Sequence, residues 1–295
     1  MMRSWRPDWP IDLALVLGTL PRGQTDPVCR QLGRQQFWLT GGTPLGPGSL
    51  QVQRRGSDIV GEAWGPGAQW FLQRMPLLLG DNDDPGGFQP AGGTVIAQQW
   101  RRHGHHWRVP ASGLVRESAI LAVLEQKVTG IESRRAWYQL CRDFGEPAPG
   151  PAPARMHVVP DRQTLISIPS WWWRRAGVDH HRAATLIRVA RQGLAPDDPD
   201  DARRRLAAIP GIGPWSLAEI GCRAFGDPDA VSIGDFHLAN VIGYALTGRP
   251  RSTDDQLLEL LAPFAGHRYR AVRMIELSGV KPPRYGPRAT LPTHR

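Results

Sequence analysis

The chain has 295 residues, 41% of them hydrophobic, and carries 36 Lys and Arg against 27 Asp and Glu, which gives a formal net charge of +9 at pH 7. This composition supports one large or two ordinary globular domains, and the positive charge favours a polyanionic partner. The three cysteines, Cys29, Cys141 and Cys222, follow no CxxC spacing. They exclude a disulfide framework and a four-cysteine iron–sulfur cluster, and they indicate a reducing compartment, which we expect to be the cytoplasm.

The first part of the chain is predicted to contain a small sheet. Short apolar runs separated by Gly-rich turns are typical of β-strands, and we predict strands at 13–20, 36–40, 51–53 and 59–63. The apolar run 11–20 is too short to span a membrane, and Asp12 interrupts it, so we expect a buried strand there rather than a signal peptide. A helix is expected over 67–79 and a loop over 80–93.

From Ser112 onward the apolar residues recur with the period of a helix. Ser112 is the expected N-cap of a helix in which Leu114, Leu121, Leu124 and Val128 share one face. A second helix is expected to end at Gly145, and further helices are predicted at 171–176, 180–192, 200–208, 214–225, 236–247, 254–262 and 267–278. The predicted fold class is α+β, with an N-terminal antiparallel sheet-and-helix domain at 1–110 and an all-helical domain at 111–295.

The segment 206–216 reads Leu-Ala-Ala-Ile-Pro-Gly-Ile-Gly-Pro-Trp-Ser and predicts a tight turn between two helices. Gly211 and Gly213 can adopt positive φ and leave no side chain in the way. Their N–H groups can therefore bind an anion such as a DNA phosphate at a helix N-terminus. Asp235 follows 20 residues after Trp215, just before another predicted helix. A phosphate site with a carboxylate at this spacing favours cleavage chemistry on DNA.

The turn, the Trp, the spacing and the Asp together resemble the helix-hairpin-helix DNA glycosylase superfamily, and within it DNA-3-methyladenine glycosylase II. The resemblance is strongest over 111–279. It implies a monofunctional glycosylase of base excision repair that flips alkylated purines, such as 3-methyladenine, out of duplex DNA and excises them by hydrolysis. The alternatives are a lesion-binding protein without activity and a glycosylase for oxidised or deaminated bases.

Asp235 is the expected catalytic residue. Cleavage of an N-glycosidic bond builds positive charge on the sugar, which a carboxylate can stabilise while it orients the attacking water. Its alternative role is the N-cap of the helix that follows. Trp215 stands where the strand-nicking members of the superfamily carry a nucleophilic Lys, so the resemblance implies hydrolysis by water. Trp215 either stacks on the extruded base or packs in the core.

The base pocket is predicted to contain Trp215, Glu219, Phe236 and Glu276. Glu219 and Glu276 stand where well-known members carry aromatic residues, and acidic groups there would favour a cationic base. In the alternative interpretation each acid pairs with an Arg of its own helix, Glu219 with Arg223 and Glu276 with Arg273.

The predicted DNA-binding residues are Gln126, Lys127, Pro210, Gly211, Ile212, Gly213 and Arg268. By the same resemblance, Lys127 stands where the family inserts a wedge residue, commonly Leu or Gln, into the gap left by the flipped base. The alternatives are an exposed Lys at a helix end and a source of weak lyase activity. Gln126 is a candidate to probe the orphaned base. We expect no cofactor and no metal. The same resemblance implies one exception, an alkali cation held by the carbonyl groups of the hairpin. The expected partner is duplex DNA with damaged bases, bound by a monomer without membrane association.

Overall fold

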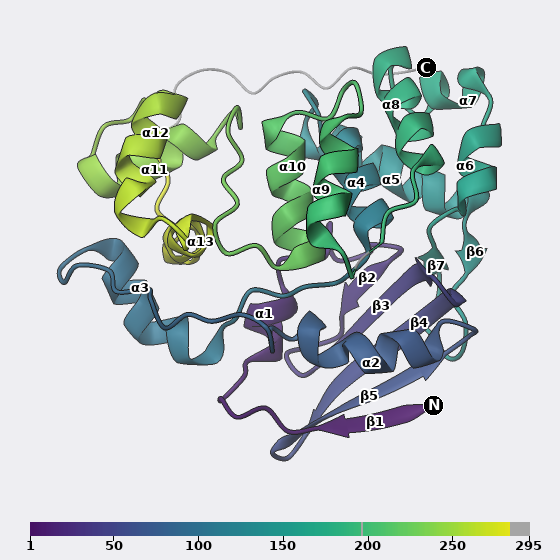
Figure 1. The fold of residues 1–295 in the computed structure, drawn as a ribbon, viewed down its shortest axis with the longest axis horizontal. Helices are drawn as coiled ribbons and strands as arrows, with labels where there is room; N and C mark the ends of the chain where they lie inside the picture. The colour runs from purple at the N-terminus through teal and green to yellow at the C-terminus, as the bar shows by residue number, and fades with distance from the viewer. Residues whose placement is uncertain (196, 284–295) are drawn as a thin grey trace.

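A five-stranded antiparallel sheet, with strand order β1-β5-β4-β3-β2, lies at one end of the molecule (Figure 1). Its strands are β1 (Met2–Trp5), β2 (Cys29–Gln31), β3 (Gln36–Thr43), β4 (Gly46–Arg55) and β5 (Asp58–Trp64). The computed structural model describes residues 1–195 and 197–283. The predicted strand at 36–40 and the hairpin at 51–63 are confirmed. In this register Leu39 pairs with Leu50 and Leu50 with Ala63, and all three side chains are buried.

The predicted helix at 67–79 is α2 (Ala68–Leu78), which packs on β4 and β5. Trp70, Phe71 and Met75 of α2 are buried, so this helix closes one face of the sheet. The loop expected at 80–93 is also present.

The predicted strand at 13–20 is wrong, because this run forms the short helix α1 (Leu13–Leu17). Asp12 is its N-cap, and the Asp12 carboxylate accepts the N–H of Leu15 at 3.1 Å. Leu13, Val16 and Leu17 are buried on one face, which is helical spacing. A continuous apolar run fits a buried strand and a short helix equally well, and the capping Asp decides between them.

The remaining elements are α3 (Val95–His103), η1 (Gly104–His106), α4 (Val115–Leu124), α5 (Gly130–Phe144), β6 (Glu146–Pro147), β7 (His157–Val158), α6 (Arg162–Ser167), α7 (Ser170–Arg175), α8 (His180–Arg191), α9 (Pro199–Ala207), α10 (Pro214–Ile220), the π-helical η2 (Gly221–Phe225), α11 (Leu238–Thr247), α12 (Asp254–Leu261), η3 (Ala262–Phe264) and α13 (Arg268–Ser278). The predicted helices from 171 onward are thus confirmed within a few residues. Within the described ranges, none of the helices is long and apolar enough to cross a membrane.

The predicted N-cap at Ser112 is wrong. Helix α4 begins at Val115, and the Ser112 hydroxyl instead accepts the N–H of Leu114 and donates to the carbonyl of Arg223 at 2.9 Å. Ser112 therefore ties the start of α4 to η2. At the other end α4 stops at Leu124, so Val128 lies beyond the helix, in the α4–α5 loop.

Two connections cross the predicted boundary at residue 110. Helix α3 packs along α13, beneath which it lies in Figure 1. The short strand β7 packs beside β3 and β4. The buried apolar residues of sheet and helices form one continuous cluster. The mixed helix-and-sheet class is confirmed, whereas the division at 110 stays a prediction, and residues 284–295 of the second predicted domain lie outside the described residues.

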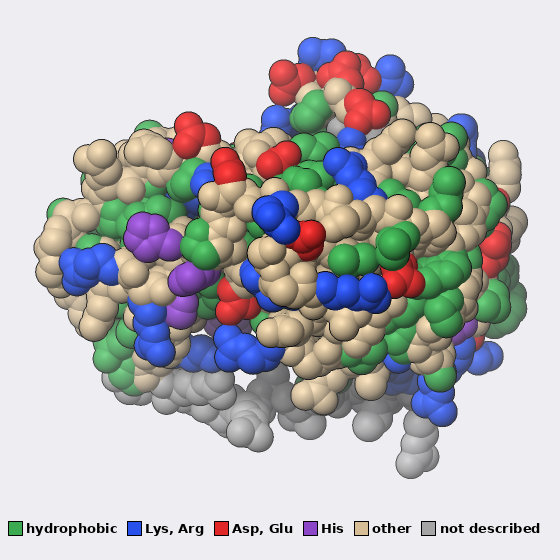
Figure 2. All heavy atoms as spheres, turned by 90° about the horizontal axis from the view of Figure 1, so that it is seen from below, with side chains coloured by type: hydrophobic (Ala, Val, Ile, Leu, Met, Phe, Trp, Pro, Cys, Tyr) green, Lys and Arg blue, Asp and Glu red, His purple; other side chains and the backbone are tan. Residues whose placement is uncertain are grey.

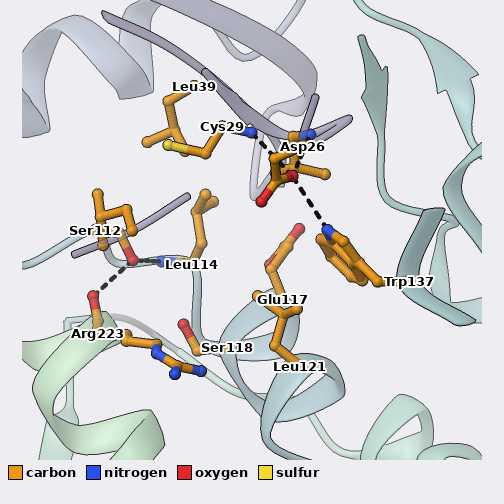
Figure 3. A pocket seen from close by; sticks show the side chains of 12 residues that line it. Asp26, Cys29, Leu39, Ser112, Leu114, Glu117, Ser118, Leu121, Trp137 and Arg223 are labelled. Carbon is orange, nitrogen blue, oxygen red and sulfur yellow. Dashed lines mark hydrogen bonds between the residues drawn. The ribbon is translucent and has the colours of Figure 1, made fainter. Parts of the chain in front are cut away.

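A cavity of about 40 Å³ lies between the sheet and the helices (Figure 3). Asp26 lines it, and its buried carboxylate accepts the N–H of Val28 at 2.9 Å and the indole N–H of Trp137 at 3.1 Å. Burial raises the pKa of Asp26. Asp26 therefore fastens the start of β2 to α5, and the cavity has room for water rather than for a nucleobase.

Candidate active site

The predicted hairpin is formed by α9, the turn 208–213 and α10. Gly211 has φ of +100°, and a Cβ built there would lie 2.2 Å from the Oγ1 of Thr185. Gly213 was also predicted to be able to adopt positive φ, but its φ is −107° and it is the extended N-cap of α10. A Cβ on Gly213 would meet nothing within 4 Å. The fold therefore requires the first glycine and leaves open space around the second.

Neighbouring side chains hold the turn through its carbonyl groups. The Pro210 carbonyl accepts hydrogen bonds from Thr185 at 3.2 Å and Arg188 at 3.4 Å, and the Gly211 carbonyl accepts one from Gln126 at 2.8 Å. Pro210 and Gly211 are exposed, whereas Ile212 is buried and its N–H donates to the Ile209 carbonyl at 3.0 Å, so a contact of Ile212 with DNA stays a prediction. An alkali cation on the hairpin carbonyls stays a prediction and would share them with these donors.

The two glycines give a matched pair of substitutions. Gly211→Ala is expected to lower the free energy of unfolding by about 1–3 kcal/mol, because it strains the backbone and presses a methyl group against Thr185. Gly213→Ala should change it by less than about 1 kcal/mol, since its backbone and surroundings accept a methyl group. Urea unfolding of both variants measures the difference, and equal losses would contradict this account of the turn.

Asp235 meets Trp215 at the start of α10. The indole Nε1 of Trp215 donates to the Asp235 Oδ2 at 3.2 Å. The other oxygen, Oδ1, accepts the N–H groups of His237 at 2.8 Å and Leu238 at 2.9 Å. The alternative role as the N-cap is therefore wrong, because α11 begins at Leu238 and His237 is its N-cap residue. One oxygen of Asp235 still accepts N–H groups at the start of α11, while the second faces the hairpin helix. Both residues are half-buried, and Trp215 also packs against the core.

Glu219 pairs with Arg223 at 2.6 Å, as the ion-pair interpretation predicts. Its second oxygen accepts the Ser232 hydroxyl at 2.5 Å. The Ser232 carbonyl in turn accepts the N–H of Asp235 at 3.2 Å, so Glu219 also braces the loop that carries Asp235. Burial is the main cause that raises the pKa of Glu219, to about 7.

The other predicted pocket residues are more exposed. Glu276 pairs with Arg273 at 2.9 Å, again as the ion-pair interpretation predicts, and its side chain is 47% exposed. Phe236 is 85% exposed and makes an edge-to-face contact with His237. It therefore stands on the open surface next to Asp235 rather than inside a closed pocket.

Gln126 and Lys127 lie in the α4–α5 loop, which rests on the hairpin. The Gln126 amide donates to the Ser216 hydroxyl at 2.8 Å, in addition to Gly211, so its donor group is already engaged by protein. Lys127 is exposed, with φ of +53°. Positive φ is uncommon outside glycine and clusters at functional positions. The loop thus presents Lys127 to the outside, next to the hairpin.

Arg268 forms an ion pair with Asp229, with 2.8 Å between its Nε and the carboxylate Oδ1. The backbone N–H of Arg268 donates to the same carboxylate at 3.0 Å. Arg268 therefore fixes the segment that precedes Asp235, and the predicted phosphate contact stays a prediction.

Two residues near this site, Arg22 and Glu125, were not predicted from the sequence. Arg22 pairs with Glu125 at 2.6 Å, and Glu125 pairs with Arg223 at 3.1 Å. Because the members of these pairs are about 100 residues apart in the chain, no local pattern indicates them.

Charged side chains of both signs are interspersed on the face shown in Figure 2, where histidine side chains also gather towards one end. Within residues 1–195 and 197–283, no three His, Cys, Asp or Glu side chains lie close enough to hold a metal ion.

Comparison with known proteins bears on the class of this site. No protein-family model matches the chain. Over 138 residues it is 30% identical to a Mycobacterium tuberculosis protein described as a "probable bifunctional transcriptional activator/DNA repair enzyme AlkA". That match covers 44% of this chain and 27% of the length of the relative.

Solved structures match over nearly the whole chain. A 3-methyladenine DNA glycosylase from Archaeoglobus fulgidus has a TM-score of 0.75, with 12% identity, over 93% of this chain and 97% of that one. An 8-oxoguanine glycosylase/lyase from Clostridium acetobutylicum has a TM-score of 0.69, also with 12% identity, over 93% and 95%. The chain has the fold of the helix-hairpin-helix DNA glycosylases, and its predicted resemblance to the 3-methyladenine glycosylase II type is confirmed.

Proposed function

We propose that this protein is a monofunctional DNA glycosylase of base excision repair that removes alkylated purines, such as 3-methyladenine, from duplex DNA. The observation that carries the proposal is the Asp235 carboxylate, which has one oxygen on the indole of Trp215 at the start of the hairpin helix. The sequence match to a DNA repair enzyme and the fold match to a 3-methyladenine glycosylase support it.

In the proposed reaction Asp235 is the catalytic residue. Its carboxylate stabilises the positive charge that develops on the sugar as the N-glycosidic bond breaks, and it orients the water that attacks the anomeric carbon. Trp215 offers an aromatic face to the extruded base, with Phe236 at the rim. Because an indole cannot form a Schiff base, the products are the free base and an intact abasic strand.

The hairpin and the α4–α5 loop are the proposed DNA-binding elements. The backbone N–H groups of Gly211 and Gly213 meet a phosphate, and the open space around Gly213 lets the strand approach closely. Lys127 enters the gap left by the flipped base, with its stem in the stack and its amine on a polar edge. We further infer a monomer with two domains, at 1–110 and 111–295, that acts in the cytoplasm and, in a bacterium, at the nucleoid.

A panel of duplexes that each contain one lesion tests this function. With enzyme in excess, we expect release of free 3-methyladenine and accumulation of alkali-labile abasic sites, without strand cleavage before alkali is added. Chromatography of the released base and gel analysis of the strand give the two readouts. Release of oxidised or deaminated bases alone would favour the alternative glycosylase, and lesion binding without release of any base would favour a binding protein.

A further inference from the structure

We propose that Glu219 determines specificity by favouring cationic alkylated bases over neutral lesions. This inference rests on the proposed function and assigns to one side chain the preference for a class of substrate. A base alkylated at a ring nitrogen carries a positive charge, whereas many other lesions are uncharged. A carboxylate in the wall of the base pocket therefore distinguishes the two classes by charge.

Glu219 lies near the two residues that the proposed reaction uses. It is one helical turn after Trp215, on the same face of α10. Its carboxylate accepts the hydroxyl of Ser232, which stands three residues before Asp235. The side chain of Glu219 is 18% exposed, so its charge is only partly screened by water.

The groups that face Glu219 form a nearly balanced set. Arg223 pairs with Glu219 and with Glu125, and Arg22 pairs with the other oxygen of Glu125. Two guanidinium groups thus offset two carboxylates. The side chain of Asp235 adds a further negative charge, so the site carries a net charge of −1 when Glu219 is ionised and zero when it is protonated.

The other ionisable side chains nearby leave this balance unchanged. Burial raises the pKa of Cys222 and of Tyr269 well above the ordinary values, so both stay neutral. Glu276 is offset by Arg273. The state of Glu219 therefore decides whether a cationic base meets a negative or a neutral wall.

The ionisation of Glu219 should make the preference for a cationic base depend on pH. Burial raises its pKa to about 7, with Glu125 and Asp235 raising it further and Ser232 and Arg22 opposing them. Glu219 is neutral below that pH and charged above it. Since kcat/KM follows ionisations of the free enzyme, the preference for a cationic base should increase as the pH rises through about 7.

The test compares release of 3-methyladenine, which is cationic in DNA, with release of ethenoadenine, which is neutral. The ratio of the two kcat/KM values is measured between about pH 5.5 and 8.5, after subtraction of spontaneous depurination. In the wild type we expect the ratio to rise about tenfold over this range. Glu219→Gln should give a low, flat ratio, because release of 3-methyladenine falls more than release of ethenoadenine. If ethenoadenine is not released, the pH profiles of 3-methyladenine release by the wild type and Glu219→Gln are compared instead, and identical profiles would overturn the inference.

Two further variants separate charge from structure. Glu219→Asp keeps a carboxylate and should retain the rise with pH, whereas Glu259→Gln removes an exposed acid of α12 and should behave as the wild type. An equal fall in the release of both bases in Glu219→Gln would show a purely structural role and overturn the inference, as would a wild-type ratio that does not change with pH. Release of neither base by the wild type would instead contradict the proposed function itself.

Discussion

Replacement of Asp235 with Asn is expected to lower the rate of base release by about 10³-fold while duplex DNA is still bound. The amide cannot stabilise the developing positive charge or accept a proton from water. Its oxygen can still accept the N–H groups of His237 and Leu238, so the start of α11 keeps these two hydrogen bonds. Single-turnover release from lesion-containing duplexes measures the loss, and titration of the same duplexes measures binding.

Another Asp at the start of a helix provides the control for this experiment. Asp161 caps α6 by accepting the N–H of Thr164 at 2.7 Å, outside the candidate site. Asp161→Asn should release base at the wild-type rate. Equal release by Asp235→Asn and the wild type would remove Asp235 from the chemistry and leave it with a structural role only.

The second large effect is expected at the buried ion pair between Asp83 and Arg270. Arg270 is fully buried and Asp83 nearly so, and two hydrogen bonds of 2.6 and 3.0 Å join them. Asp83 also accepts the N–H of Val109, and the guanidinium of Arg270 lies within 6.0 Å of the ring centres of Phe88, Trp100 and Trp107. This cluster joins the 80–94 loop and α3 to α13.

Asp83→Ala should lower the free energy of unfolding by about 3–5 kcal/mol, because it leaves the Arg270 guanidinium buried without its counter-charge. Loss of the aromatic packing around Arg270 would add to this cost. Urea unfolding measures the change. The pair Asp83→Leu with Arg270→Met should be less destabilising than Asp83→Ala alone, since it leaves no unpaired charge in the core.

An exposed ion pair provides the comparison. Asp58 pairs with Arg6 at 2.6 Å on the surface, where water screens both charges. Asp58→Ala should therefore leave the unfolding transition almost unchanged. If Asp83→Ala is equally mild, the contact between the 80–94 loop and α13 does not depend on this ion pair.

Local sequence patterns predicted much of the fold and the residues at the centre of the candidate site. The strands at 36–43 and 46–55 are short runs bounded by turns, and residues 50–53 of the second alternate between buried and half-buried. The helices from 171 onward show apolar residues at helical spacing. The hairpin could be predicted from the sequence because its glycines and prolines define the backbone conformation within a few residues. Reliance on local patterns also explains the wrong prediction at 13–20, because the five residues of α1 are all buried or half-buried and fit a strand as well as a helix.

The sequence by itself determined the helical hairpin, the position of Trp215 at the start of α10 and the presence of Asp235 ahead of the next helix, because each depends on spacing along a short segment. Only the tertiary structure decided that the Trp215 indole meets the Asp235 carboxylate, and that Arg22 and Glu125 join the predicted pair of Glu219 and Arg223. These contacts join residues that are distant in the chain. Their energies depend on burial and on charge separation in space, and neither quantity follows from residue order.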